Sequence, residues 1–287
     1  MRKYLEFIKP GIIFGNGIAV VAGYFLGSQG SFDGLLFAYT MVGISLVIAS
    51  GGAWNNVIDR DIDAVMERTQ KRVLVRGLIP LVWAGVIASL LGILGLVILA
   101  YGTNALAVTV ASGGWLIYVG LYTIWLKRSS IHGTLIGSLS GAVPPAVGYC
   151  AVANRFDLPI ILLVLAMCFW QMPHSYAIGI YRETDFRAAR IPLFPLIKSA
   201  LLTKMNMLFY AVGFVVFALL LTGFGYTGMV YGLVIGTAGF LWIGLIVAGF
   251  WANNDAVWAR KVFITSILLV TLLSLCITLN VQIYGHL

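Results

Sequence analysis

The chain consists of long apolar runs separated by short polar segments. A helix needs about 20 residues to cross a hydrocarbon core of about 30 Å, because it rises about 1.5 Å per residue. Runs of that length occupy residues 12–28, 35–55, 79–101, 105–126, 133–153, 158–180, 205–222, 228–250 and 262–284. The pattern predicts an all-α integral membrane protein with nine transmembrane helices, in one domain that covers residues 1–287.

Composition agrees with this class. Hydrophobic residues make up 61% of the chain, charged residues 10%, and the mean hydropathy is +0.99, values that do not fit a soluble globular protein. Many of the 33 glycines lie inside the apolar runs, where small residues let helices approach closely. Cys150, Cys168 and Cys276 lie in or at the ends of apolar runs without metal-ligand spacing, so no disulfide framework is expected.

The basic residues alternate between connections. Of 18 lysines and arginines, 17 lie before the first run, after the second, fourth and sixth runs, or before the ninth, and the exception is Arg155. The positive-inside rule then predicts a cytoplasmic N-terminus and a C-terminus outside. The net charge of +8 is explained by this topology. Because the basic residues are distributed over several short loops, no nucleic-acid binding is expected.

Residues 55–63 form the most unusual polar stretch. If the second helix continues past Trp54, then Asn55, Asp59 and Asp63 recur every four residues on one face and span roughly 12 Å. Carboxylates this close repel one another unless a positive charge lies among them, and Mg²⁺ binds through one or two carboxylates together with substrate phosphates. The spacing predicts a metal-bridged phosphate site. The alternative is a charged helix end, neutralised at the membrane surface by the cations that follow it.

The two longest connections, around 59–77 and 181–192, contain six of the ten acidic residues, among them Glu183 and Asp185. The other connections are short, so we expect any chemistry to lie between these two loops. Within the nine runs, His174 is the one ionisable group far from an end. Ion-coupled carriers usually place carboxylates near the middle of the bilayer, so this distribution favours an enzyme at one interface over a transporter.

Several intramembrane residues permit two interpretations. Tyr118 and Tyr122 share a helix face, which suits an interfacial aromatic belt or a ligand site. Lys127 is either an anchor at the membrane surface or a phosphate contact. Pro144 and Pro145 break a helix and free carbonyl groups, and so can shape a cavity wall. The stretch 170–176 holds Gln171, a helix-breaking Pro173 and His174, which indicate either hydrogen-bonded packing or a polar hollow.

Taken in order along the chain, these motifs resemble those of the intramembrane prenyltransferases of the UbiA type, and among them the branch that uses haem as acceptor. The resemblance runs from Lys9 to about Lys261. The matching pieces are Asn55-x-x-x-Asp59-x-x-x-Asp63, Arg68-Thr69-x-x-Arg72, Tyr122-x-x-x-x-Lys127-Arg128, Gly141-Ala142-Val143-Pro144-Pro145, Trp170-Gln171-Met172-Pro173-His174 and Asp185-Phe186-x-x-Ala189-x-Ile191-Pro192. The wider superfamily commonly has a second Asp four residues after the first in the last motif, where this chain has Ala189; Glu183 is a candidate substitute.

The resemblance implies a UbiA-type helical bundle in a bacterial inner membrane, with the transfer of a farnesyl group from farnesyl diphosphate to a vinyl group of haem B, giving haem O. It implies a Mg²⁺ site formed by Asn55, Asp59, Asp63 and Asp185. The other implied site residues are Arg68, Arg72, Lys127 and Arg182 for the diphosphate, Tyr118, Tyr122 and Trp170 for the allylic cation, and His174 for orienting haem or handling a proton.

The same resemblance implies contact with membrane lipid and an association with haem-copper oxidase assembly or haem A synthase. Two alternatives stay open. One is the same fold acting on a phenolic precursor of a quinone, and the other is a non-catalytic carrier of haem or lipid in which the acids only bind a cation.

Overall fold

The structure is a computed structural model that describes residues 2–284. Within these residues the regular secondary structure is entirely helical, without a strand, and nine segments are long and apolar enough to cross a membrane. They are α2 (Pro10–Ser28), α3 (Gly34–Ile58), α5 (Leu81–Gly102), α6 with η1 and α7 (Ala105–Ser129), α8 with α9 (Gly133–Ala153), α10 (Leu158–Tyr181), α13 (Ala200–Gly223), α14 with η2 (Met229–Trp251) and α15 (Asp255–Tyr284). The prediction of nine spans is confirmed. The largest difference is in the last one, whose helix begins at Asp255 rather than at residue 262.

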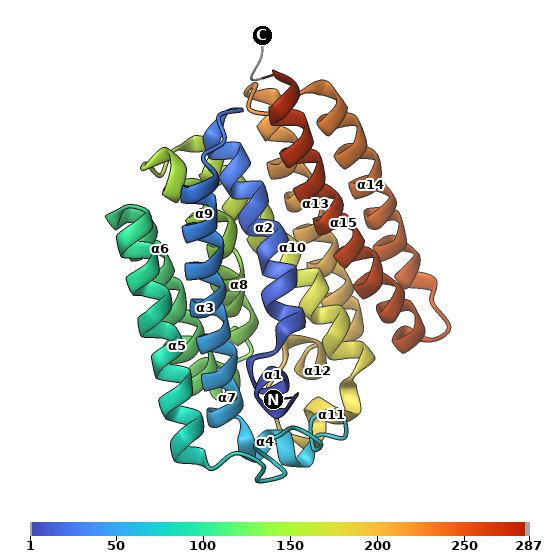
Figure 1. Ribbon diagram of the computed structural model, residues 1–287. Helices are drawn as coiled ribbons and strands as arrows, with labels where there is room; N and C mark the ends of the chain where they lie inside the picture. The colour runs from blue at the N-terminus through green and yellow to red at the C-terminus, as the bar shows by residue number, and fades with distance from the viewer. Residues whose placement is uncertain (1, 285–287) are drawn as a thin grey trace.

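The nine spans pack side by side into one bundle (Figure 1). The first span, α2, packs against α3 and α9 and also against α15, so the first and last spans are neighbours in space. The short helices α1 (Arg2–Ile8), α4 (Arg60–Val65), α11 (Glu183–Ala188) and α12 (Phe194–Ile197) all lie at one end of the bundle (Figure 1). The two acidic loops therefore meet at the same end. Which end faces the cytoplasm stays a prediction, as does the single domain, and the predicted outside C-terminus lies beyond the described residues.

Glycines bring α2 and α9 into backbone contact. A Cβ atom at Gly148 of α9 would lie 2.3 Å from the Val20 carbonyl oxygen, and one at Gly23 of α2 would lie 1.9 Å from the Pro145 carbonyl oxygen. No side chain fits at those distances. The sequence expectation of close packing through small residues is confirmed here.

Two helix irregularities shape the interior. The fifth span breaks at Ala142, and Pro144 then lies in the first turn of α9, where a missing N–H removes no helical bond. In the fourth span the backbone widens into a π-helix, η1 (Leu116–Leu126), and the Thr123 hydroxyl donates to the Tyr118 carbonyl at 2.8 Å. The expected break at Pro173 was wrong, because α10 continues through it. Membrane helices tolerate an internal proline where neighbouring groups satisfy the freed carbonyl.

Candidate active site

Asn55, Asp59 and Asp63 form a ladder on one helix face, as the spacing predicted. Helix α3 ends at Ile58 and α4 begins at Arg60, but the backbone bonds Asp59 N to Asn55 O (2.9 Å) and Asp63 N to Asp59 O (2.8 Å) keep the four-residue register across the junction. The three residues are 6%, 0% and 4% exposed. This burial contradicts the alternative of a solvated helix end, because ionised carboxylates are buried only where other groups compensate their charge.

Each residue of the ladder is in contact with a cationic side chain from a different segment. Lys9 donates from Nζ to Asn55 Oδ1 at 2.6 Å, and Arg72 pairs through Nη1 with Asp63 Oδ2 at 2.5 Å. Lys127, at the end of η1, forms an ion pair with Asp59. Asn55 also donates to Asp59 Oδ2 at 2.6 Å, so the ladder is one connected network. The predicted residues Arg72 and Lys127 thus lie at the acids.

Lys9 is a site residue that the sequence did not identify. Lys9 lies between α1 and α2, directly before Pro10, and its backbone is left-handed (φ 55°). Burial, reinforced by the positive charge of Arg72, lowers the pKa of Lys9 to about 7. The sequence signal for Lys9 was its position at the start of the first span. The positive-inside rule already accounts for a cation at that position, so Lys9 was not identified as a site residue.

Asp61, between the ladder positions, faces outward. It forms a two-pronged ion pair with Arg128, whose Nη1 and Nη2 each lie 2.7 Å from a carboxylate oxygen. The Arg128 hydrogen bonds lower the pKa of Asp61 to about 2. Its side chain is 65% exposed, so this pair joins α4 to α7 (Lys127–Ser129) at the surface. Arg128 Nη2 also lies 3.5 Å from Asp59 Oδ1, which connects the surface pair to the ladder.

The second acidic loop lies opposite the ladder. Asp185 in α11 is 6% exposed, and within the described residues its carboxylate has no hydrogen bond or ion pair. Arg68 interacts electrostatically with both Asp63 and Asp185, which places it between the two loops. Arg182 also interacts with Arg68, and its guanidinium lies 4.5 Å from the Tyr181 ring centroid. By contrast, Glu183 is half exposed and pairs with Arg187 at 2.6 Å, so it does not replace the missing acid at Ala189.

The ladder suits a metal ion that arrives with a phosphate ligand. In the part of the chain that the structure describes, no three His, Cys, Asp or Glu side chains converge into a ready cage. Two buried carboxylates and an amide oxygen on one face are nevertheless the donor set through which Mg²⁺ binds, the remaining positions being filled by water and phosphate oxygens. The residues therefore fit Mg²⁺ when phosphate and water supply the remaining ligands.

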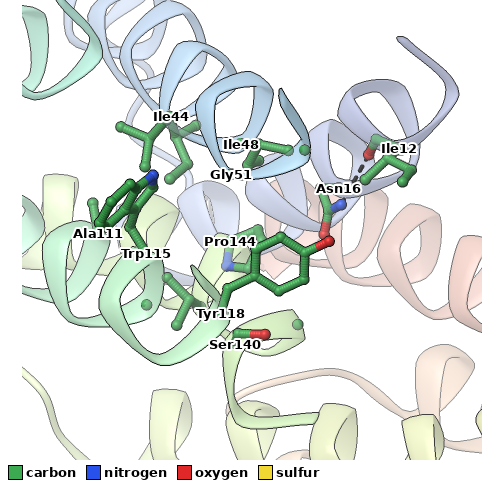
Figure 2. Close-up of a pocket in the computed structure, with 15 residues that line it drawn as sticks. Ile12, Asn16, Ile44, Ile48, Gly51, Ala111, Trp115, Tyr118, Ser140 and Pro144 are labelled. Atoms are coloured by element: carbon green, nitrogen blue, oxygen red, sulfur yellow. Dashed lines mark hydrogen bonds between the residues drawn. The ribbon is translucent and has the colours of Figure 1, made fainter. Parts of the chain in front are cut away.

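Two connected cavities open beside the ladder. The larger, about 670 Å³, is lined by residues from α2, η1, α8, α10 and α15, among them Tyr118, Tyr122, Trp170 and His174. The smaller, about 130 Å³, is lined by apolar groups of α3, α6 and α9 and shares Asn16 and Tyr118 with the larger one. Figure 2 shows the Tyr118 hydroxyl directed toward Asn16 at this junction.

The aromatic residues connect the cavities to the charged network. Tyr118 and Tyr122 stack with ring centroids 6.0 Å apart, and both interact electrostatically with Asp59. On the smaller cavity, Gly51 and Gly52 lie one helical turn before Asn55. Both cavities are therefore lined by residues that adjoin the ladder.

His174 lies on the far wall of the larger cavity. Its ring stacks on Trp170 with centroids 4.7 Å apart and lies 4.9 Å from the Phe263 ring. Its Nδ1 atom is 2.7 Å from Ser266 Oγ, and Trp170 Nε1 donates to the Ser266 carbonyl at 2.8 Å. His174 is thus both hydrogen-bonded in the packing and part of a cavity wall, so both interpretations of this stretch hold in part. Ser266 is a second residue that the sequence did not identify.

The family model of the UbiA prenyltransferases matches residues 17–267. The chain belongs to the UbiA prenyltransferase family. The curated relatives of this UbiA member include protoheme IX farnesyltransferases from Yersinia pseudotuberculosis (48% identity over 99% of this chain and 97% of the relative) and Chromohalobacter salexigens (50% identity over 99% and 96%). These findings confirm the predicted family and a prenyltransferase as its enzyme class.

Solved structures confirm the UbiA fold. A structure of digeranylgeranylglyceryl phosphate synthase matches with a TM-score of 0.81 at 22% identity, covering 98% of both chains. A UbiA homologue from Archaeoglobus fulgidus, bound to DMAPP and Mg²⁺, matches with a TM-score of 0.74 at 12% identity, over 96% of this chain and 99% of that one. At these identities the likeness concerns the fold alone.

Proposed function

We propose that this UbiA member transfers the farnesyl group of farnesyl diphosphate to a vinyl group of haem B and so forms haem O. The proposal rests on the buried ladder of acids and cations and on a cavity of about 670 Å³, a size within the range of small-molecule sites, whose lining residues Tyr118 and Tyr122 interact electrostatically with Asp59. The names of relatives that are 48–50% identical over nearly the whole chain support the choice of substrates.

The donor diphosphate binds between the two acidic loops. Asn55, Asp59 and Asp63 on one side and Asp185 on the other would hold Mg²⁺, which would supply positive charge for the departing diphosphate. The structure of the A. fulgidus homologue with DMAPP and Mg²⁺ supports this assignment. The bases of the network are Arg68, Arg72, Lys127 and Arg182, and they give charge-assisted hydrogen bonds to phosphate oxygens. Arg72 and Lys127, which pair with Asp63 and Asp59 here, would be in place to bind phosphate oxygens if the acids held a metal ion.

The aromatic groups stabilise the allylic cation. As the C1–O bond breaks and diphosphate leaves, C1 of the farnesyl chain becomes positive, and Tyr118 and Tyr122 present ring faces near it. Each such contact contributes about 0.5–2 kcal/mol. Trp170 lines the same cavity further from the ladder. The terminal vinyl carbon of haem then bonds to C1, and the resulting positive carbon next to the porphyrin adds water and releases a proton, which leaves a hydroxyethylfarnesyl group.

Water must be kept out until the first bond forms, because it would otherwise capture the allylic cation. The described lining of the larger cavity is mainly apolar and contains no lysine or arginine. That lining also argues against the phenolic alternative, since a benzoate acceptor needs a cation to hold its carboxylate at this depth. A carrier of haem or lipid would need neither the ladder nor its matched bases.

The test of the acceptor uses purified protein with Mg²⁺, farnesyl diphosphate and either haem B or 4-hydroxybenzoate, and resolves the products by mass. We expect haem O from the first mixture, no prenylated benzoate from the second, and no product from Asp59→Asn with either acceptor. A farnesylated benzoate with unchanged haem B would overturn the haem assignment while sparing the metal site. Binding of haem without any product, under conditions in which diphosphate is bound, would favour the carrier.

The proposed setting is the bacterial inner membrane, with membrane lipid around the nine spans. Haem O is apolar and poorly soluble in water, so its transfer to the next enzyme favours direct contact. We therefore propose association with haem A synthase or with haem-copper oxidase assembly. Co-purification of such a partner from solubilised membranes tests this step.

A further inference from the structure

The hydroxyl of Ser266 fixes which nitrogen of His174 carries a proton. Ser266 Oγ donates its one proton to the Phe263 carbonyl, at 2.6 Å. The same oxygen lies 2.7 Å from His174 Nδ1, and for this second bond it has lone pairs but no further proton. The tautomer with the proton on His174 Nδ1 is the one that satisfies both contacts at once. In the neutral ring Nε2 then holds the lone pair.

That lone pair has no partner among the residues that the structure describes. Within residues 2–284 no hydrogen bond reaches His174 Nε2, and the side chain lines the larger cavity. The ring cannot turn freely, because it stacks on Trp170 and contacts Phe263, and Trp170 is itself bonded to the Ser266 carbonyl. A rigid neutral imidazole thus offers one free nitrogen to a molecule in the cavity.

We propose that His174 Nε2 is an axial ligand of the iron of the haem acceptor, and that Ser266 is the positioning residue that holds the imidazole in the tautomer this requires. The inference rests on the proposed function and specifies how its acceptor binds. A metal-bound histidine almost always donates its other N–H to a nearby acceptor, which fixes the ring and raises its basicity. Ser266 occupies that place here, and histidine is a common protein ligand of haem iron.

The surroundings favour a ligand over a group that handles a proton. The described contacts of the ring are two aromatic side chains and one hydroxyl, none of them a carboxylate. A proton taken up at Nε2 would create an imidazolium in an apolar span without a counter-charge, which is unfavourable. Coordination uses the same lone pair and leaves the ring neutral.

The proposed ligand and the aromatic residues of the donor site share one cavity. Its lining includes His174 of α10 together with Tyr118 and Tyr122 of η1, and both tyrosines interact electrostatically with Asp59. A haem bound by His174 would therefore occupy the cavity that adjoins the ladder.

The test is a titration of ferric haem into the purified full-length protein, followed by absorbance and electron paramagnetic resonance, without farnesyl diphosphate. We expect the spectrum of a nitrogen-ligated haem in the wild type and its loss in His174→Gly. Added imidazole should restore it in His174→Gly, because the free ligand occupies the space of the missing ring. An unchanged spectrum in His174→Gly overturns the proposal.

Ser266 is tested by a matched set. Ser266→Ala should weaken haem binding about 10- to 100-fold, the usual effect of removing a hydrogen-bond partner of a metal ligand, and Ser266→Thr should retain it because the hydroxyl is kept. The control is Ser138→Ala, which removes another buried hydroxyl that donates to a helix carbonyl (Leu135 O, 2.7 Å) but does not contact a histidine. Equal binding by Ser266→Ala and the wild type, or a loss in Ser266→Thr equal to that in Ser266→Ala, overturns the role of Ser266.

The product assay separates this inference from the function on which it rests. If the wild type forms haem O but its haem spectrum shows no nitrogen ligand, the role of His174 as an iron ligand is refuted and the proposed function stands. A farnesylated phenol, together with no haem binding at all, refutes the haem assignment itself.

Discussion

Lys9 donates a hydrogen bond of 2.6 Å to the side-chain oxygen of Asn55, although the two residues are 46 positions apart. The bond joins the start of the first span to the end of the second. The pairs that Lys127 and Arg72 form with Asp59 and Asp63 balance the two carboxylates of the ladder. Metal and diphosphate therefore do not enter an uncompensated cluster of charges. They exchange with bases that are already present.

The first prediction concerns Lys9. Lys9→Met keeps the length of the side chain but removes its charge, and we expect kcat/KM for farnesyl diphosphate to fall about 10- to 100-fold, since a hydrogen bond to a charged group contributes about 1.5–3 kcal/mol. The control is Lys3→Met, because Lys3 is exposed and donates to the Leu78 carbonyl away from the ladder. Steady-state kinetics with limiting farnesyl diphosphate measure both. Equal kcat/KM values for Lys9→Met and the wild type would show that Lys9 only anchors α2.

The second prediction concerns the ladder carboxylates. Asp59→Asn and Asp63→Asn preserve size but remove a charged ligand, and each should lower kcat/KM at least about 100-fold, equivalent to about 2.7 kcal/mol of transition-state stabilisation. Raising the Mg²⁺ concentration should recover part of the loss. Arg60→Ala is the matched control, since Arg60 is an exposed neighbour on the same short helix, α4, and its variant should remain near wild-type activity. Full activity of Asp59→Asn at limiting Mg²⁺ would exclude a metal-binding ladder.

The sequence predicted the parts of the site that depend on local periodicity. Asn55, Asp59 and Asp63 align because helical hydrogen bonds repeat every four residues, so their spacing alone indicated one face. Lys9 and Ser266 were missed because their partners lie 46 and 92 positions away, and only the packing of α2 on α3 and of α15 on α10 brings them together.

Glu183 is a residue that the sequence suggested for the site and that the structure places outside it. Its position two residues before Asp185 suggested a ligand, but in α11 it lies on the outer face and pairs with Arg187 four residues later. Pro173 was also misjudged, because the sequence cannot show whether neighbouring groups allow a helix to continue past a proline.

The third prediction is that both acidic loops face the cytoplasm, as the distribution of 17 of 18 cations indicates. Cys150, Cys168 and Cys276 are first replaced, and single cysteines are then introduced as Gln70→Cys and Arg187→Cys, at exposed positions of the two loops. A membrane-impermeant thiol reagent should label both from the cytoplasmic side alone. Arg155→Cys, in the connection assigned to the opposite side, should label from outside. Labelling of positions 70 and 187 from different sides would be incompatible with a shared site.

The last prediction concerns the glycine contact that positions α2. A Cβ atom at Gly148 would lie 2.3 Å from the Val20 carbonyl oxygen and 2.9 Å from the Tyr24 amide nitrogen, and neither backbone atom can rotate away. Gly148→Ala should therefore separate α2 from α9 and lower stability in detergent by about 1–3 kcal/mol, seen as a reduced Tm. Activity should fall as well, because α2 contributes Asn16 to both cavities and follows directly after Lys9.

Gly113→Ala is the matched control for this substitution. A Cβ atom at Gly113 would have no neighbour within 4 Å, and alanine has the higher helix propensity, so Tm should stay the same or rise slightly. If Gly148→Ala and Gly113→Ala had the same Tm, close backbone contact between α2 and α9 would not stabilise the bundle. A normal Tm with reduced activity in Gly148→Ala would instead show that the contact sets the position of Lys9 and Asn16 at the site rather than the stability of the fold.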